Sequence, residues 1–170
     1  MSKSVQEADQ VEHFVSYFFT KYGFCILLGV VILAVYGQVY DFDYAYYDDA
    51  QYVFENPNVN TGLSGKNAIW AFSVGYAANW HPVTWLSHML DVSLFGIRPG
   101  GHHVVSLLIH LANSLLLFLF FRKTSGSRFV AAGISFLFAV HPLRAESVAW
   151  IAERKDVLFM LWGMISLFFF

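Results

Sequence analysis

The fold of this chain is decided by one apolar stretch, YGFCILLGVVILAVYGQV, which runs from Tyr22 to Val39 without a charged residue. A helix that crosses the hydrocarbon core of a bilayer needs about 20 residues, and this stretch is long enough. It is too long for the core of a signal peptide, and its end at 36–39 lacks the small-residue pattern of a cleavage site. We therefore predict an uncleaved signal anchor.

The composition of the whole chain supports the same conclusion. Of its 170 residues, 57% are hydrophobic and only 13% are charged, against roughly 25% charged in an ordinary soluble domain. The formal net charge of -2 excludes a strongly basic nucleic-acid binder, so no nucleic acid is expected among its partners. A single cysteine, Cys25, excludes a disulfide framework and a cysteine metal site.

Three further apolar segments predict an all-α polytopic membrane protein. The lipid bilayer is therefore expected among its partners. We expect a cytoplasmic amphipathic tail (1–21), a first membrane helix (22–39), an extracytoplasmic loop with interfacial helices and an acidic motif (40–102), a second membrane helix (103–121), a cytoplasmic hinge (122–128), a third membrane helix (129–143), a second extracytoplasmic loop (144–156) and a truncated fourth membrane helix (157–170).

The orientation follows from the basic residues near the ends of these segments. The hinge 122–128 has three Lys or Arg in seven positions, whereas the loop 40–102 has only Lys66 and Arg98. The N-terminus and the hinge are therefore predicted to be cytoplasmic, although three basic residues in 144–156 oppose this. The host membrane is expected to be a bacterial inner membrane or that of the endoplasmic reticulum.

The tail 1–21 has apolar residues at helical spacing, as in an amphipathic helix that lies on a membrane surface. The alternative is that it simply extends the first membrane helix at its N-terminal end.

The long loop contains signals for short helices. Asp48 or Asp49 can cap a helix that continues to Phe54, because an Asp side chain accepts hydrogen bonds from first-turn amides. Ser64 can cap a second helix that ends at about Ser73.

A third helix is predicted to begin at Pro82, which suits a first helical turn. Trp85 and Met89 share one face of it, while His88 and Asp91 lie three positions apart on the other face. A tryptophan near its start is typical of a helix at the membrane interface. The loop is thus expected to roof the membrane helices.

The second membrane helix has a polar stripe made of His103, Ser106, His110, Asn113 and Ser114. These residues fall on one helix face, which should look into protein rather than lipid. Packing against other helices and the lining of an active-site cavity both explain such a stripe.

The segment 141–156 reads HPLRAESVAWIAERKD. Pro142 is expected to end the third membrane helix early and to leave a polar loop, which is tolerated at membrane depth only where protein or a cavity surrounds it. An odd number of crossings separates both this loop and Asp48–Asp49 from the cytoplasm. The two are therefore predicted to meet on one side of the membrane.

This arrangement suits a glycosyltransferase that uses a lipid-phosphate sugar. A phosphate leaves without a proton donor, so one carboxylate that takes the acceptor's proton suffices, and attack opposite the phosphate inverts the anomeric centre. Cations must then stabilise the phosphate, a role open to Arg144, Arg154 and Lys155. The alternatives are that Asp48 or Asp49 is only a cap and surface charge, and that the basic loop is only a solvated ion-pair cluster.

Four blocks together resemble a known family. They are Tyr47–Tyr52, Asn79–Trp85, the helix His103–Asn113 and His141–Asp156. They resemble the membrane part of the transmembrane and tetratricopeptide-repeat O-mannosyltransferases, which belong to the GT-C superfamily of polyprenyl-phosphate-sugar-dependent enzymes. A GT-C-like arrangement of these N-terminal helices is the fold that the resemblance implies.

The resemblance also implies a function and a set of site residues. It implies transfer of mannose, or a similar hexose, from a polyprenyl-phosphate-linked sugar to the hydroxyl of a protein acceptor. It places Asp48 on the catalytic aspartate and Asp49 on its acidic neighbour, without deciding which is the base. Beside the three phosphate-binding candidates, the expected cavity or positioning residues are His81, His103, His110, His141, Glu146 and Asp156.

No cofactor is predicted, and a divalent metal is left open because no ligand cluster is evident beyond Asp48 and Asp49. Members of the family have further membrane helices and a helical repeat array, so we expect a fragment that is inactive alone. The competing interpretations are a noncatalytic membrane anchor or remnant, and a fragment of a polytopic transporter.

Overall fold

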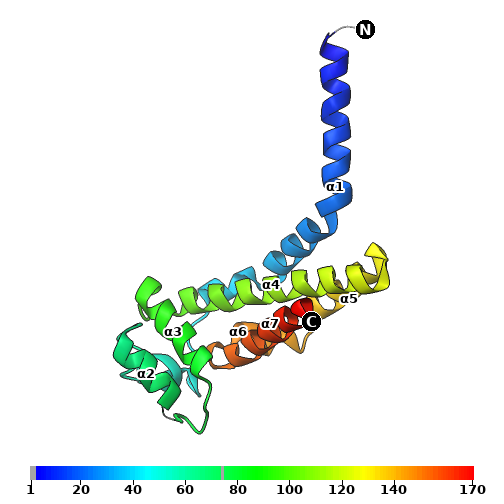
Figure 1. Cartoon of the computed structure of the whole chain (residues 1–170). Helices are drawn as coiled ribbons and strands as arrows, with labels where there is room; N and C mark the ends of the chain where they lie inside the picture. The colour runs from blue at the N-terminus through cyan, green and yellow to red at the C-terminus, as the bar shows by residue number, and fades with distance from the viewer. Residues whose placement is uncertain (1–2, 74) are drawn as a thin grey trace.

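The computed structural model describes residues 3–73 and 75–170, with side chains described from residue 17 onward. Every regular element in this range is helical (Figure 1). The elements are α1 (Lys3–Tyr36), η1 (Gly37–Asp41), η2 (Ala50–Phe54), α2 (Gly65–Ser73), α3 (Pro82–Phe95), α4 (Pro99–Ser125), α5 (Arg128–Val140), α6 (Arg144–Ala149), η3 (Ile151–Glu153) and α7 (Arg154–Phe169).

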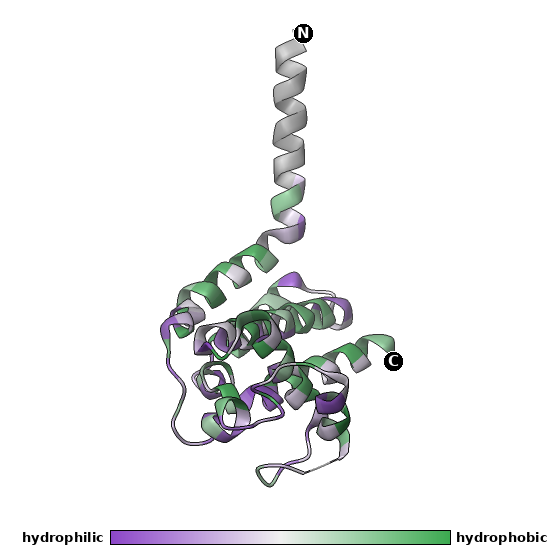
Figure 2. Ribbon diagram, turned by 90° about the vertical axis from the view of Figure 1, so that its left-hand side faces the viewer, coloured by the Kyte–Doolittle hydropathy of each residue, from purple (hydrophilic) through white to green (hydrophobic). Residues whose placement is uncertain are grey.

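Two segments are long and apolar enough to cross a membrane, Tyr17–Asp41 and Pro99–Ser125. The first is mostly uncovered by the rest of the chain, as expected of a helix that faces lipid. Figure 2 shows apolar residues along the second half of α1 and along the C-terminal helix. The predicted fold class, an all-α membrane protein, is confirmed.

Helix α4 is the central element, since it packs against α1, α5 and α7 (Figure 1). It turns back into α5 at Gly126, whose φ of 68° is the left-handed conformation that ends many helices. The core around it is formed by the buried side chains of Leu28, Ile32, Tyr36, Val39, Leu107, Phe118, Ala131, Ala132, Ala139 and Val148.

A second core lies at the end of the bundle where the loops gather. It joins η2, α2 and α3 of the first loop to η3 of the second, through Tyr52, Val53, Val59, Ala71, Trp85, Met89, Ile151 and Ala152. The two loops are thus packed together at one end of α4. His88 and Asp91, which were predicted to lie on a different face of α3 from Trp85 and Met89, are also buried.

Several local predictions can be compared with the structure. Ser64 caps α2 through a 3.1 Å hydrogen bond from the Asn67 amide, and Pro82 begins α3, as predicted. The capping role of Asp49 is wrong, since its side chain accepts no bond from the first turn of η2. The short helix α6 stands where a non-helical loop was expected.

The predicted domain boundaries are not tested by the fold. Helix α1 runs without a break through the expected border between tail and membrane helix, and the side chains of 1–16 lie outside the described part. The division into tail, loops and hinge therefore stays a prediction.

A tight reversal occurs between Tyr76 and Asn79, whose backbones form an isolated antiparallel bridge. Between them, Ala77 and Ala78 have φ of 49° and 60°. Such left-handed angles are uncommon for residues with a side chain.

Candidate active site

The two adjacent aspartates have opposite surroundings. Asp49 is fully buried, and each of its carboxylate oxygens accepts a backbone hydrogen bond. Oδ2 accepts from the Ala45 amide and Oδ1 from the Ala152 amide, both at 2.8 Å. Asp49 therefore fastens the first loop to the second across 103 positions of sequence.

Burial and hydrogen bonding act on Asp49 in opposite directions. Removal from water raises the pKa of its carboxyl, and the two backbone amides partly counter that rise. Both oxygens of this group are thus engaged by backbone amides. Its contacts are those of a residue that fixes the loop.

Asp48 is partly exposed, and no hydrogen bond or ion pair to its carboxylate is found among the described residues. It lies close enough to Tyr52 to affect that phenol. Burial, followed by the negative charges of Asp48 and Glu153, raises the pKa of Tyr52 to about 12, while its hydroxyl accepts a 3.2 Å hydrogen bond from Asn79 Nδ2. Asp48 is thus the unengaged carboxylate of the pair.

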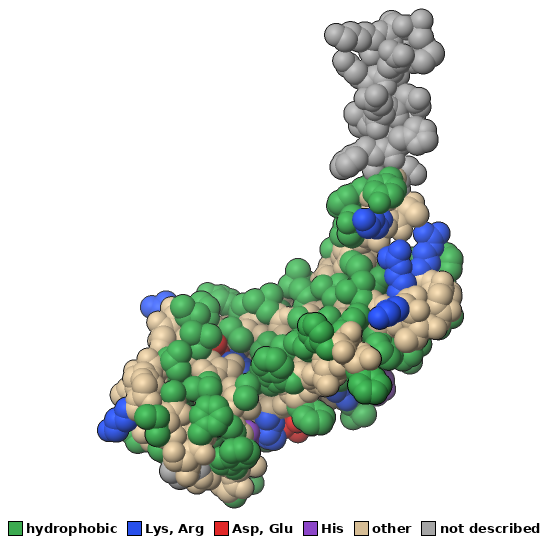
Figure 3. All heavy atoms as spheres, in the orientation of Figure 1, with side chains coloured by type: hydrophobic (Ala, Val, Ile, Leu, Met, Phe, Trp, Pro, Cys, Tyr) green, Lys and Arg blue, Asp and Glu red, His purple; other side chains and the backbone are tan. Residues whose placement is uncertain are grey.

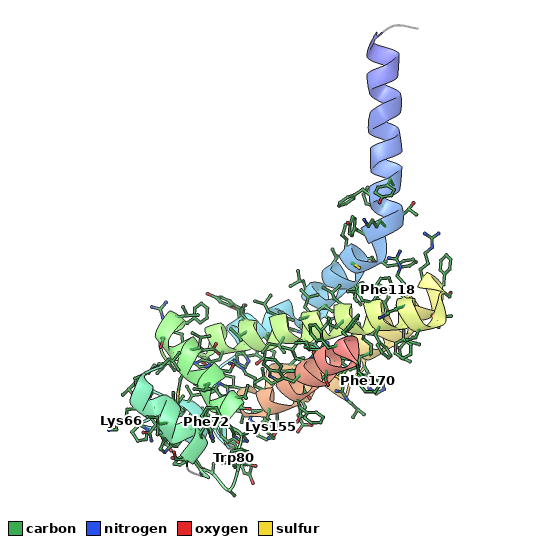
Figure 4. All side chains as sticks on the ribbon, viewed as in Figure 1. Lys66, Phe72, Trp80, Phe118, Lys155 and Phe170 are labelled. Carbon is green, nitrogen blue, oxygen red and sulfur yellow. The ribbon has the colours of Figure 1, made fainter. Side chains whose placement is uncertain are left out.

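A cavity of about 390 Å³ lies next to this motif, between the start of α3 and the first half of α7. Its lining residues are His81, Pro82, Val83, Thr84, Lys155, Asp156, Leu158, Phe159 and Trp162. The imidazole of His81 stacks at 5.4 Å from the ring of Tyr52, which joins the cavity to the acidic motif. Figure 4 shows Lys155 at the same end of the molecule as Trp80 and far from Phe118.

The cavity is polar at one end and apolar at the other. The ammonium of Lys155 pairs with the carboxylate of Glu153 at 2.7 Å, and burial together with the positive charge of Lys155 lowers the pKa of His81. Phe159 and Trp162, about one and two helical turns further along α7, are 83% and 56% exposed. The cavity therefore offers a cation followed by an apolar wall.

The three predicted phosphate-binding cations do not lie together. Arg144 stands over the ring of Phe138 at 5.2 Å, near the end of α5. Arg154 is fully buried. Of the three, only Lys155 lines the cavity.

Arg154 is held by four partners. It pairs with the carboxylate of Asp91, and it donates to the hydroxyls of Ser87 at 3.0 Å and Ser106 at 3.1 Å and to the carbonyl of His102 at 2.5 Å. It thereby ties the start of α7 to α3 and α4. Such a fully engaged guanidinium favours a structural role over phosphate binding.

The remaining predicted site residues divide between the cavity and the packed interior. His81 and Asp156 line the cavity. His103 and His110 are buried within the bundle, where His110 Nε2 lies 3.0 Å from the Ala139 carbonyl.

The other two, His141 and Glu146, are exposed. His141 Nδ1 accepts a 3.3 Å hydrogen bond from the Leu143 amide just after the end of α5, as in a helix-terminating turn. Neither of them approaches the cavity lining.

One cluster was missed by sequence reasoning. His88, Asp91 and His102 place one ligand-type atom each within 4.8 Å of one another. The spacing of His88 and Asp91 was visible, but His102 comes after the Gly96 turn, and nothing in the sequence indicates how α4 folds back on α3. The sequence left a metal open because no ligand cluster was evident beyond Asp48 and Asp49, and the structure brings together a candidate group at His88, Asp91 and His102.

The chain is similar to several protein O-mannosyl-transferases. It is 33% identical to TMTC1 of Mus musculus over 132 residues, which cover 71% of this chain, and 30% identical to TMTC1 of Homo sapiens over 156 residues, which cover 85% of it. Tmtc1 of Drosophila melanogaster is 32% identical over 119 residues, or 65% of this chain. The matched part spans only 14% to 17% of these relatives. No family model and no solved structure matches the chain.

Proposed function

Because the chain shares a family with the TMTC protein O-mannosyl-transferases, we propose that it carries the acidic motif and part of the donor site of a membrane mannosyltransferase. The donor is a polyprenyl-phosphate-linked sugar and the acceptor is a protein hydroxyl. Since the chain matches about a sixth of these relatives, the complete reaction belongs to a longer protein.

The observation that carries this proposal is the difference between Asp48 and Asp49. A general base needs an unengaged carboxylate within reach of the acceptor, and Asp48 is partly exposed. Its neighbour in the motif, Tyr52, contacts His81 of the cavity lining. Asp49, with both oxygens bonded to amides, fixes the loop so that Asp48 keeps its position. Asp48 is therefore the base and Asp49 its positioning residue.

The cavity offers a lipid-phosphate donor one cation and an apolar wall. Lys155 supplies a positive charge for the phosphate, and the exposed apolar side chains of Phe159 and Trp162 offer a surface for the polyprenyl chain. Helix α7 leads from that charge toward the membrane.

The chemistry then needs one proton transfer. The acceptor oxygen attacks the anomeric carbon from the face opposite the phosphate, its proton passes to Asp48, and the carbon–oxygen bond to the phosphate breaks. The lipid phosphate leaves with the bonding electrons, its charge next to Lys155. The sugar arrives on the acceptor with inverted configuration.

The proposal also includes a membrane orientation. Lys and Arg side chains gather where α4 turns into α5, close to α1 (Figure 3). Such a cluster favours the cytoplasmic side. The loops with Asp48 and the cavity then lie on the opposite side, and α5 and α7 complete a multi-pass arrangement.

The test is a pair of substitutions in the full-length protein, assayed for mannose transfer from a synthetic lipid-phosphate donor. Asp48→Asn should reduce turnover by about 100-fold or more, as expected for loss of a general base. Its thermal stability should be unchanged. Asp49→Asn should lower stability and, because Asp49 holds Asp48 in position, also reduce the turnover of the folded fraction, although by less than Asp48→Asn does. Full activity in Asp48→Asn would remove Asp48 from the mechanism.

A further inference from the structure

We propose that His88, Asp91 and His102 form a binding site for a divalent transition metal of the zinc type. His88 and Asp91 lie on α3 and His102 lies near the start of α4. One potential ligand atom from each lies within 4.8 Å of the other two, and all three residues are buried. The site goes beyond the proposed sugar transfer and does not depend on it.

The first argument is the condition of His88. Its side chain has no exposed surface, yet neither ring nitrogen has a hydrogen-bond partner among the described residues. Burying an unpaired polar group costs about 1–3 kcal/mol, and an unoccupied ion site is one physical reason for such a group. A metal would satisfy this imidazole without rearranging α3.

The second argument is how close the three side chains lie to one another. The ring of His102 lies 5.6 Å from that of His88, and its Nδ1 lies 3.1 Å from Asp91 Oδ2. The three groups therefore converge on one point between two helices. Zinc binding requires Zn–N distances of about 2.0–2.1 Å, so the three side chains must draw closer together when the metal binds.

The donor set decides the class of metal. Two imidazole nitrogens and one carboxylate oxygen suit zinc and neighbouring transition metals, whereas calcium and magnesium prefer oxygen ligands alone. Metal binding requires neutral imidazoles, and His88 and His102 are both fully buried. A water molecule would complete four-coordination.

Arg154 is expected to limit the affinity of this site for a metal ion. It bonds to Asp91 Oδ2, so the metal must use the other carboxylate oxygen. A partner of this kind orients a ligating carboxylate, but its positive charge repels a dication in a buried site. Replacement of Arg154 by a neutral residue should therefore strengthen metal binding.

Occupation of the site would link α3 to α4 across the turn at Gly96. Helix α3 lies beside the cavity through His81 and Pro82, so the metal would stabilise one wall of that cavity. Metal loading should therefore be visible as a rise in thermal stability.

The experiment uses the chain purified in detergent with a histidine-free affinity tag. After treatment with a chelator, it is dialysed against zinc chloride, and bound zinc is measured by elemental analysis together with the melting temperature. We expect about one zinc per chain, as for a dedicated structural site, with a raised melting temperature. Cobalt chloride should give the visible absorption of a four-coordinate site.

The variants His88→Ala and His102→Ala should weaken zinc binding by about 100-fold or more, since outer-shell partners alone contribute roughly 10- to 100-fold. The matched control is His103→Ala, which removes another buried, unpaired imidazole from the same helix as His102. It should leave zinc binding unchanged. Arg154→Gln should tighten binding in the fraction that folds.

Three outcomes would overturn the proposal. They are substoichiometric zinc in the wild-type chain, equal zinc binding in His88→Ala and His103→Ala, and no cobalt absorption. If His88→Ala does not fold, His88→Gln keeps a polar side chain at that position without an imidazole, and it should still lose the zinc-dependent rise in melting temperature. Retention of that rise in His88→Gln would equally exclude the site.

Discussion

The two ends of the helix bundle hold their polar groups by different means. At the α4–α5 turn the bonds are local, such as Thr124 Oγ1 to the Phe120 carbonyl at 3.1 Å and the Val130 amide to Ser127 Oγ at 3.4 Å. At the loop end they join distant parts of the chain, as between Asp49 and the amide of Ala152. The α4–α5 turn is held by hydrogen bonds between residues close in sequence, and the loop end by hydrogen bonds between residues far apart in sequence.

This difference teaches where sequence changes should matter. A local bond can be replaced by water when one partner is lost, whereas a buried long-range bond leaves its partner unsatisfied. Substitutions at the loop end should therefore cost stability, and those at the turn should cost little. The expected effects of substitutions are given below from the largest to the smallest.

The largest effect is expected for Arg154→Met. Its loss leaves Asp91 as a buried charge without its cation, which typically costs about 3–5 kcal/mol. Unfolding of the detergent-solubilised chain, followed by circular dichroism, would measure the change. Because Arg154→Lys keeps the charge but not the fork of donors, it should recover only part of the loss. A change below about 1 kcal/mol for Arg154→Met would remove the distinction between the two ends.

Asp49→Asn comes next. The amide oxygen can still accept from one backbone N–H, but its NH₂ would face the other donor, and the resulting unsatisfied group costs about 1–3 kcal/mol. The matched control is Asp48→Asn, which removes a partly exposed carboxylate and should lie within about 0.5 kcal/mol of wild type. Equal destabilisation by both substitutions would contradict the separate roles of the two aspartates.

Ser127→Ala tests the turn end. Ser127 caps α5 by accepting a bond from the Val130 amide, and removal of such a cap costs about 1 kcal/mol. Ser127→Asn should restore most of this stability, because Asn is also a good cap. A loss as large as that of Arg154→Met would mean that the turn is not held locally.

The smallest effect on stability is expected for Lys155→Gln. The Lys155–Glu153 pair is partly exposed, and such pairs contribute about 0–1 kcal/mol. In the full-length enzyme the KM for the lipid-phosphate donor should nevertheless increase about tenfold, by analogy with a charge-assisted contact of about 1.5 kcal/mol. Lys123→Gln, at the opposite end, should leave this KM unchanged. A normal KM in Lys155→Gln would exclude it from the donor site.

Much of the helical architecture could be predicted from sequence because it rests on local rules. The apolar stretch from Tyr22, the cap at Ser64 and the first-turn position of Pro82 each depend on neighbouring residues. Their elements begin or end within a few positions of the prediction. The polar stripe on α4 was also rightly expected to face protein, since all five of its residues are buried.

The site could be predicted only in part, because it depends on how helices fold back on each other. From sequence spacing, Asp48 and Asp49 are equally good candidates for the catalytic base. The structure distinguishes them, because Asp49 accepts a hydrogen bond from the amide of Ala152. Arg154 and Lys155 are neighbours, so their sequence context is the same. Helical rotation of about 100° per residue sends one into the core and the other to the cavity, and no local signal distinguishes them.

The reversal at Ala77 and Ala78 has a consequence for how this region can change. Two left-handed residues in succession are the backbone of a tight hairpin turn that Asn and Gly adopt more easily. The strain is sustained by Asn79, whose side chain bonds both to the Ala77 carbonyl at 2.8 Å and to the Tyr52 hydroxyl. An Asn-Gly pair at these two positions would adopt the turn more easily, and the turn would then depend less on the hydrogen bond from Asn79.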